Sequence, residues 1–395
     1  RDALAQKYGA RFVSQGGLKV YTTLDLDLQE KIEDIVKQEI DKLSPLKVTN
    51  GSAMVLDPKT GQILAMVGSR DYHYPGFGNF NATIALRQPG SSIKPATYAA
   101  AFKQGFTPGN TVLDTPISFR DGTKVYSPTN YDGKFHGPVS LRVALGSSYN
   151  VPAVKLLASV GIDQMIQTAR DLGISTFKDN AKFGLSLTLG GGEVTMVDMM
   201  SMYATFSQMG VKRQPIAVLK IEDSEGRLID SFKDNPRQVL DEGIAYLVTS
   251  ILSDNNARAP AFGTNSLLRI PGHDVAVKTG TSDNKRDNWT FGYTPNFVVG
   301  VWVGNNDNSP MDPSLTSGIT GAAPIWNKIS NIILADQESI PFKKPESIIE
   351  VKVDGRKDLS LSSITPKGMV RMRKEADKLI FSDPFTTYAT ESANF

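Results

Sequence analysis

Two hydrophobic periodicities follow one another along the chain, and their order is the feature that most constrains the fold. Residues 52–67 and 274–303 contain short apolar runs separated by polar turns, whereas residues 93–209 repeat apolar side chains at helical spacing. Strands that return after a long helical stretch can join the earlier strands in one sheet. The sequence therefore predicts a largely antiparallel sheet with helices packed against it.

The two ends of the chain follow other patterns. Residues 16–23 are typical of a short strand, and apolar side chains between Leu28 and Leu43 recur at helical spacing until Ser44-Pro45 ends the predicted helix. Beyond Pro341 the residues are more polar and less periodic. We therefore divide the chain into a linker region at 1–50, a main domain at 51–340 and an accessory segment of unassigned purpose at 341–395.

Composition excludes several classes of function. The 43 basic and 41 acidic residues nearly cancel, so no overall field favours nucleic acid as a partner. Cysteine is absent, and His73, His136 and His273 lie far apart without metal-ligand spacing, so we expect neither a metal nor another cofactor. No apolar run is long enough for a membrane span, and we expect an excised soluble piece.

The first candidate motif is Ser91-Ser92-Ile93-Lys94, where a turn enters a predicted helix. Residues three apart are neighbours on a helix, so an unprotonated Lys94 amine is placed to take the Ser91 proton while the hydroxyl attacks a carbonyl. A free lysine titrates near 10.4, so the site must favour the neutral amine by burial or nearby positive charge. Taken alone, the motif is weak, and a serine cap followed by a solvated lysine is its ordinary explanation.

The second candidate, Ser148-Tyr149-Asn150, lies between two predicted helices and directly before Val151-Pro152. The Ser148 hydroxyl is suited to relay a proton to a leaving amine, and the Asn150 amide to hold a peptide backbone. A polar turn with capping side chains is the structural alternative.

The third candidate, Lys278-Thr279-Gly280-Thr281-Ser282, ends a predicted strand. Lys278 and the hydroxyls of Thr279 and Thr281 are suited to hold a carboxylate, and Gly280 would let a ligand approach the backbone closely. The backbone N–H of Thr281 would pair with that of Ser91 around an oxyanion. A strand-end turn is again the structural alternative.

The order of the three motifs is more specific than any one of them. It resembles the order in the β-lactamases and penicillin-binding proteins, which acylate a serine with the help of a lysine. Three surrounding phrases narrow the resemblance to class A penicillin-binding proteins, from about Gly17 to about Trp326: they are Arg-Gln-Pro-Gly-Ser-Ser-Ile-Lys-Pro from Arg87, Tyr-Asn-Val-Pro-Ala-Val from Tyr149, and Gly-Tyr-Thr-Pro-Asn-Phe-Val-Val-Gly-Val-Trp-Val-Gly from Gly292.

The resemblance implies a fold and a reaction. The fold would be α+β, with a largely antiparallel central sheet, helices on both faces and a helical subdomain. The reaction would be peptidoglycan transpeptidation, in which a serine attacks a stem peptide ending in D-Ala-D-Ala, releases D-Ala, and passes the acyl group to a neighbouring amine. β-Lactams would acylate the same serine. The implied roles are Ser91 as nucleophile, Lys94 as base, Ser148 as proton relay assisted by Lys278, Asn150, Thr279, Gly280 and Thr281 as substrate-binding residues, and the backbones of Ser91 and Thr281 as the oxyanion hole.

The resemblance also implies a longer parent protein. In class A proteins a segment like Leu18-Lys19-Val20-Tyr21 follows a glycosyltransferase domain and a membrane anchor. Residues 1–50 would then be the linker after that domain, the parent would be bifunctional and membrane-anchored, and this piece would lie outside the cytoplasm.

Other functions remain open at this stage. A D,D-carboxypeptidase or β-lactamase would use water as the acceptor, and a catalytically silent β-lactam sensor or scaffold would keep the fold without turnover. Tyr149 stands where class A β-lactamases usually have Asp, which favours a transferase. Glu193 cannot be assigned to deacylation, since the resemblance gives its segment a structural role near the site, and Thr188 is a further candidate for the lining of the site.

Overall fold

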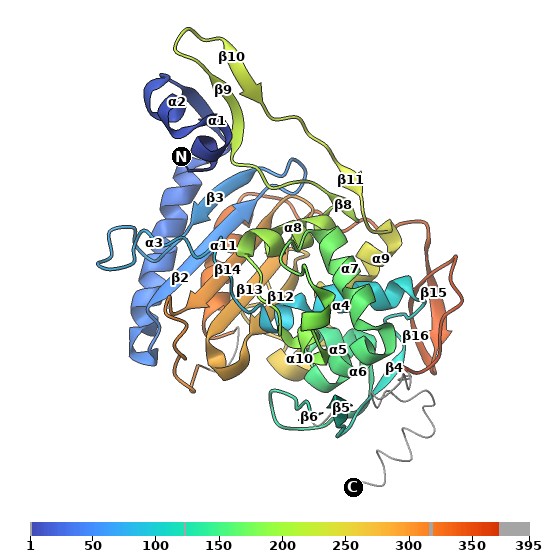
Figure 1. Cartoon of the computed structure of the whole chain (residues 1–395). Helices are drawn as coiled ribbons and strands as arrows, with labels where there is room; N and C mark the ends of the chain where they lie inside the picture. The colour runs from blue at the N-terminus through green and yellow to red at the C-terminus, as the bar shows by residue number, and fades with distance from the viewer. Residues whose placement is uncertain (1, 122–123, 316–318, 371–395) are drawn as a thin grey trace.

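A five-stranded antiparallel sheet forms the centre of the computed structural model, which describes residues 2–121, 124–315 and 319–370. The two edge strands of this sheet are β12 (Ala276–Thr281), which contains most of the third candidate motif, and β3 (Ile63–Val67) (Figure 1). Every neighbouring pair is antiparallel, as the sequence predicted. In order across the sheet the strands are β12 (Ala276–Thr281), β13 (Asp287–Tyr293), β14 (Val298–Gly304), β2 (Asn50–Leu56) and β3 (Ile63–Val67).

Helices cover both faces of this sheet, so the three central strands are buried along their whole length. On one face lie α3 (Leu26–Leu43) and α11 (Ala322–Leu334), and on the other lie α8 (Met196–Ser207) and α9 (Glu242–Leu252) (Figure 1). The apolar stripe of α3 is the predicted one, with Ile32, Val36 and Ile40 buried against the sheet. The α+β prediction with helices on both faces is therefore confirmed.

A helical subdomain packs beyond α8 and α9, with α4 at its centre. Nine of the ten residues of α4 are buried, which explains why this helix shows no polar stripe. The other helices surround it, and most of them end at a glycine, such as Gly161 or Gly173. The helices are α4 (Lys94–Lys103), α5 (Leu141–Gly146), α6 (Asn150–Val160), α7 (Ile162–Leu172) and α10 (Asn255–Phe262), with short turns η3 (Asn180–Lys182) and η4 (Leu185–Leu189).

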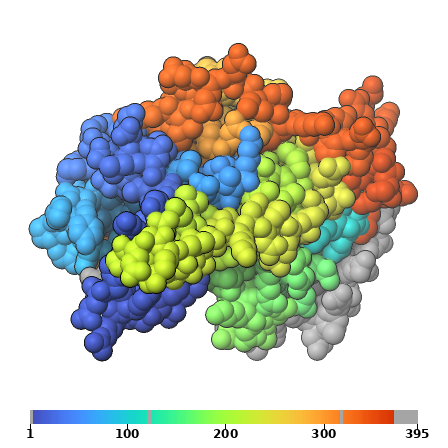
Figure 2. Space-filling model, turned by 90° about the horizontal axis from the view of Figure 1, so that it is seen from above, coloured from blue at the N-terminus to red at the C-terminus, as the bar shows by residue number. Residues whose placement is uncertain are grey.

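The first residues fold against a segment that is distant in sequence. Helix α1 (Asp2–Tyr8) and helix α2 (Ala10–Gln15) lie beside the hairpin of β9 (Val218–Glu222) and β10 (Leu228–Ser231) (Figures 1 and 2). Lys7 forms an ion pair of 2.6 Å with Asp230. The predicted strand at residues 16–23 is β1, which joins the edge of that hairpin. These strands are β1 (Lys19–Thr22), β9 (Val218–Glu222) and β10 (Leu228–Ser231), and a nearby pair is β8 (Val211–Lys212) with β11 (Arg237–Gln238).

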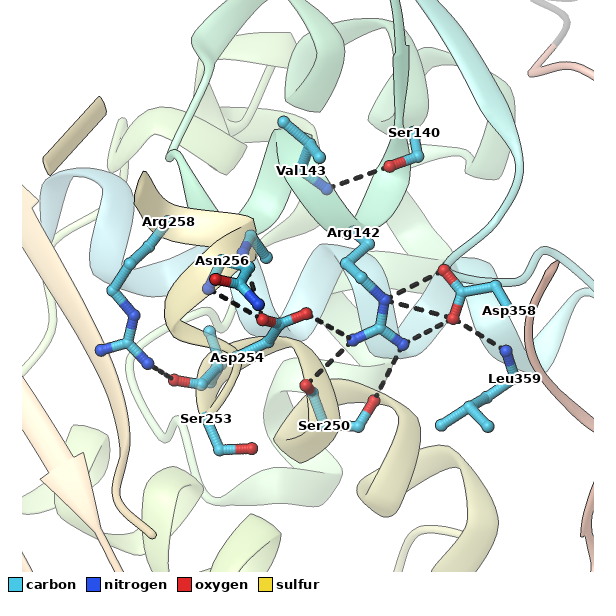
Figure 3. Close-up of polar contacts among 12 residues, drawn as sticks. Ser140, Arg142, Val143, Ser250, Ser253, Asp254, Asn256, Arg258, Asp358 and Leu359 are labelled. Atoms are coloured by element: carbon cyan, nitrogen blue, oxygen red, sulfur yellow. Dashed lines mark hydrogen bonds and ion pairs between the residues drawn. The ribbon is translucent and has the colours of Figure 1, made fainter. Parts of the chain in front are cut away.

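The segment after Pro341 contains a hairpin that docks on the helical subdomain. Its strands are β15 (Ile348–Val353) and β16 (Arg356–Leu361), and Asp358 accepts two-pronged hydrogen bonds from Arg142 of α5 (Figure 3). The same guanidinium donates to the Ser250 carbonyl of α9 at 3.0 Å. Residues 371–395 of the predicted accessory segment lie outside the described residues.

Two small antiparallel strand pairs complete the helical subdomain. One pairs β4 (Thr111–Asp114) with β7 (Gly137–Ser140), and the other pairs β5 (Phe119–Asp121) with β6 (Lys124–Tyr126).

Among the helices of the described ranges, none is long and apolar enough to cross a membrane. The same ranges contain no cluster of three or more His, Cys, Asp or Glu side chains that would hold a metal ion.

Candidate active site

The first motif lies in a turn that leads into a helix, as the sequence predicted. The turn is the 3₁₀ element η2 (Gly90–Ile93), which carries Ser91, and α4 begins at Lys94. A 3₁₀ turn has three residues per turn, so residues three apart fall on the same side of it, and the pairing of Ser91 with Lys94 stays a prediction. Ser91 is half-buried, whereas Ser92 is fully buried and donates to the Pro89 carbonyl at 2.6 Å.

Glycines let η2 lie directly against strand β12. A Cβ on Gly280 would overlap the Pro89 carbonyl oxygen and lie 3.0 Å from the Ser92 nitrogen. A Cβ on Gly90, whose φ is +54°, would lie 2.6 Å from the Thr281 nitrogen. We expected Gly280 to admit a ligand, but the space its side chain would fill is occupied by the serine turn. The glycines therefore bring the first and third motifs into contact.

The second motif turns sharply into α6. Ser148 has a left-handed backbone, with φ of +62°, and Asn150 is the first residue of the helix. A non-glycine residue in this region carries about 1–3 kcal/mol of strain, which persists where surrounding contacts fix it. Asn150 was expected in the connection between helices and is instead the first helical residue.

The side chain of Lys94 binds this turn through three contacts. Its ammonium nitrogen lies 2.7 Å from the Ser148 carbonyl oxygen, 3.0 Å from the Tyr149 carbonyl oxygen and 2.8 Å from Asn150 Oδ1. The lysine is fully buried. One side chain of the first motif therefore fixes all three residues of the second.

Lys278 joins the third motif to the second. Its Nζ donates to the Ser148 hydroxyl at 2.7 Å and to the Thr279 carbonyl at 2.9 Å. Thr279 is buried with a relative exposure of 5%, and Thr281 at the end of the strand is half-buried. Ser148 thus lies between two lysines, one contacting its backbone and one its hydroxyl.

The electrostatics of the two lysines favour a neutral amine. Burial, and then the positive charge of Lys278, lower the pKa of Lys94 well below its usual value, and Asp114 opposes them. Burial, and then the positive charge of Arg258, lower the pKa of Lys278 to about 7. Arg258 of α10 is itself buried and donates to the carbonyls of Leu252 and Leu268.

The three acceptors around Lys94 act against this lowering, because a charged ammonium has three hydrogens to donate and a neutral amine only two. When the amine is neutral, one of these acceptors loses its partner and the lone pair becomes available.

Several residues that shape the candidate site were not identified from the sequence. Arg258 carries no motif, and its effect on Lys278 arises only when the fold brings these two distant residues together. Arg87 was quoted as part of a phrase, and it lies over the Trp302 ring while donating to the Asn305 and Asn306 carbonyls, so it anchors the segment before the serine. Neither role leaves a local signal.

The remaining candidates lie around the site with different exposures. Glu193 is exposed, and its carbonyl accepts from Thr176 at 2.7 Å. Gly190 of the same segment packs against Gly90, so this stretch supports the serine turn. Thr188 is fully buried and shares a hydrogen bond with Thr97 at 2.8 Å, which leaves its hydroxyl engaged inside the subdomain.

The chain folds into an antiparallel sheet and a helical subdomain, and three motifs meet between them: the serine turn, the Ser-x-Asn turn and the Lys-Thr-Gly strand. This combination defines the class of serine–lysine acylating proteins. The family model "Penicillin binding protein transpeptidase domain" matches residues 51–331. The chain therefore belongs to the penicillin-binding protein transpeptidase family.

Individual relatives are similar over most of the chain. Penicillin-binding protein 2D of Bacillus subtilis is 31% identical over 350 residues, which cover 87% of the chain and 49% of that protein. Penicillin-binding protein 1A of Neisseria flavescens is 34% identical over 307 residues, covering 76% of the chain and 38% of that protein. The chain thus spans about half or less of the length of these relatives.

A solved structure of the family shares the fold. It is that of the PonA1 protein of Mycobacterium tuberculosis in complex with penicillin V, with a TM-score of 0.75 and 25% identity. The match covers 87% of this chain and 93% of the other. The resemblance seen in the sequence to penicillin-binding proteins of class A is confirmed.

Proposed function

We propose that the chain is a peptidoglycan D,D-transpeptidase that works through an acyl-enzyme on Ser91. The observation that carries the proposal is the position of Ser148, whose backbone accepts from Lys94 at 2.7 Å and whose hydroxyl accepts from Lys278 at 2.7 Å. Ser148 thus contacts both buried lysines, Lys94 through its backbone carbonyl and Lys278 through its hydroxyl, which supports a role for that hydroxyl in lysine-assisted acyl transfer.

In the first step the neutral Lys94 amine takes the Ser91 proton while Ser91 Oγ bonds to the penultimate D-Ala carbonyl carbon of the donor peptide. The carbonyl oxygen becomes an oxyanion, and the backbone N–H groups of Ser91 and Thr281 would stabilise it. When the peptide C–N bond breaks, the leaving D-Ala nitrogen receives a proton through the Ser148 hydroxyl. The products are the acyl-enzyme and free D-Ala.

Substrate orientation would come from the third motif and from Asn150. The hydroxyls of Thr279 and Thr281 and the charge of Lys278 would hold the terminal carboxylate of the donor, while Gly280 keeps the strand close to the serine turn. The Asn150 amide, fixed by Lys94, would position the donor backbone. In the second step an acceptor amine attacks the ester, and the same groups return the proton to Ser91.

The proposal extends to partners and place. β-Lactams would acylate Ser91 as the donor peptide does, consistent with the penicillin V complex of the PonA1 protein. The parent would carry a glycosyltransferase domain and a membrane anchor, and act outside the cytoplasm, where peptidoglycan stem peptides are found.

The alternative reactions differ in the acceptor. A D,D-carboxypeptidase or β-lactamase needs a water held for deacylation, and Tyr149 takes the place of the Asp in class A β-lactamases, while Glu193 is exposed. A silent sensor or scaffold would not turn over at all. The two lysines around Ser148 favour turnover over silence.

The test uses a stem-peptide donor ending in D-Ala-D-Ala together with an added amine acceptor, with Ser91→Ala as the matched control. We expect D-Ala release with formation of the amide product, and neither product from the variant. Release of D-Ala with hydrolysis alone at saturating acceptor would assign a carboxypeptidase, and no release by folded protein would assign a silent scaffold.

A further inference from the structure

Helix α6, which carries Asn150, has no local cap. Tyr149 occupies its N-cap position and makes no side-chain hydrogen bond to the helix. The first backbone N–H groups of a helix have no partner within it, and a buried unpaired N–H destabilises the fold. Pro152, the third residue of the helix, has no N–H to satisfy. Asn150 and Val151 therefore need an acceptor from elsewhere.

Asn130 supplies that acceptor from a segment twenty residues earlier. Its Oδ1 accepts from the backbone nitrogens of Asn150 at 2.8 Å and Val151 at 3.1 Å. The preceding carbonyl, that of Thr129, accepts from the Asn150 side chain at 3.0 Å. The Thr129–Asn130 segment thus holds both the backbone and the side chain of the last residue of the second motif.

Asn130 is in turn fixed by a carboxylate with no exposed surface. Asn130 Nδ2 donates to both oxygens of Asp114 at 2.8 and 2.7 Å and to the Lys134 carbonyl at 2.8 Å. These acceptors admit only one orientation of the amide, with the oxygen toward α6. A carboxylate is costly to bury without partners, so Asp114, at 0% exposure, is there together with the groups that it accepts from.

His136 closes the arrangement on the other side. Its Nδ1 lies 2.6 Å from Asp114 Oδ2, and its backbone N–H donates to the same oxygen at 3.1 Å. The imidazole stacks on the Tyr149 ring with centroids 4.0 Å apart and planes at 9°. Tyr149, the middle residue of the second motif, is thereby packed against a ring that Asp114 orients.

We propose that Asn130 is a positioning residue for the acylation step: held by Asp114 and His136, it caps α6 from outside and sets where the Ser148–Asn150 turn meets Lys94. This inference rests on the proposed function for its kinetic consequence, but its structural part stands on the hydrogen bonds alone. None of the three residues belongs to the Ser-x-x-Lys, Ser-x-Asn or Lys-Thr-Gly motifs.

The variants are Asn130→Ala, Asn130→Asp, Asp114→Asn and the double variant Asn130→Asp/Asp114→Asn. The alanine removes the cap, and either single exchange breaks the match of donors and acceptors, since Asn130→Asp sets two carboxylates face to face. In the double variant, the side chain at position 130 again has an oxygen that accepts from α6, and the amide at position 114 donates to the side chain at position 130. Asn327→Ala is the control, because its amide donates to the Leu267 carbonyl at 2.8 Å on the exposed side of α11.

The kinetic readout separates binding of benzylpenicillin from the acylation rate constant, with melting temperature measured alongside. We expect Asn130→Ala to acylate about 10²-fold more slowly, the loss that follows a misplacement of about 1 Å, with initial binding changed less than threefold. The double variant should recover at least tenfold over either single variant. Equal loss in binding and rate, or no rescue, would make Asn130 merely structural and overturn the proposal.

A second readout does not need activity. Hydrogen exchange of the peptide covering residues 148–157 should speed up at least tenfold in Asn130→Ala and stay unchanged in Asn327→Ala. If wild-type protein is not acylated, the proposed function fails while the exchange result still decides on the cap. Unchanged exchange in folded Asn130→Ala would overturn the inference whatever the kinetics.

Discussion

Gly280→Ala is the substitution whose effect follows most directly from the structure. The added Cβ would overlap the Pro89 carbonyl oxygen and lie 3.0 Å from both the nitrogen and the Cβ of Ser92. An ordinary carbon–oxygen contact is about 3.3 Å, so the serine turn and β12 must separate by roughly 1 Å. All three of these atoms belong to the backbone or to a buried side chain, so none can rotate away.

The separation acts on rate more than on stability. Overpacking of this kind costs about 1–3 kcal/mol of folding free energy. A displacement of about 1 Å between a nucleophile and its oxyanion donors costs about 10²-fold in rate. We therefore expect Gly280→Ala to fold and to acylate with benzylpenicillin about two orders of magnitude more slowly than wild type.

The control variant is Gly184→Ala. The assay measures the rate of adduct formation by intact-mass spectrometry of samples quenched at successive times. Gly184 has an extended backbone with φ of −120°, and no atom lies within 4 Å of where its Cβ would be. Its variant should acylate at the wild-type rate. Wild-type acylation by folded Gly280→Ala would refute the idea that this glycine holds the serine turn against the strand.

Three further predictions test the electrostatics and the docking of the C-terminal hairpin. Because the folded pKa of Lys278 is about 7 and its unfolded value about 10.4, the wild type should gain stability relative to Lys278→Met as pH rises from 7 to 10, by at most about 1.4 kcal/mol per pH unit in denaturant titrations. A difference that does not change with pH would contradict the lowered pKa. Arg258→Met removes a charge that lowers the pKa of Lys278, so in this background the gain should begin at higher pH; an unchanged onset would exclude that charge as a cause. Asp358→Asn weakens the two-pronged pair of Asp358 (9% exposed) with Arg142 (18% exposed) and should cost about 1–3 kcal/mol by thermal denaturation, whereas Asp223→Asn, whose partner Arg227 is 72% exposed, should cost less; equal costs would refute the docking role.

The sheet and the three motifs could be predicted because their signals are local. Alternating or continuous apolar runs mark β2, β13 and β14, and each motif occupies consecutive residues. The expectation that Ser91 and Lys94 are neighbours rests on a spacing of three, which puts residues on one side of both α- and 3₁₀-helices, so the 3₁₀ turn at Ser91 is compatible with it.

What could not be predicted depends on contacts between distant segments. Gly280 was assigned to ligand approach because the sequence does not reveal that Pro89 fills the space beside it. Asn130 leaves no signal, since a helix cap normally lies next to its helix and this one comes from another segment. The hairpin after Pro341 was missed because its two strands bury only a few residues near their ends, among them Ile348, Val353 and Leu361, which hides the usual alternation.

The most direct test of the central claim is intact-mass spectrometry after incubation with benzylpenicillin, followed by peptide mapping of the adduct. The account predicts one long-lived adduct on the peptide containing Ser91, and none on Ser91→Ala, whose loss of a half-buried hydroxyl should leave the protein folded. An adduct that persists in the variant, or a wild-type adduct mapped to Ser92 or to another serine, would contradict it.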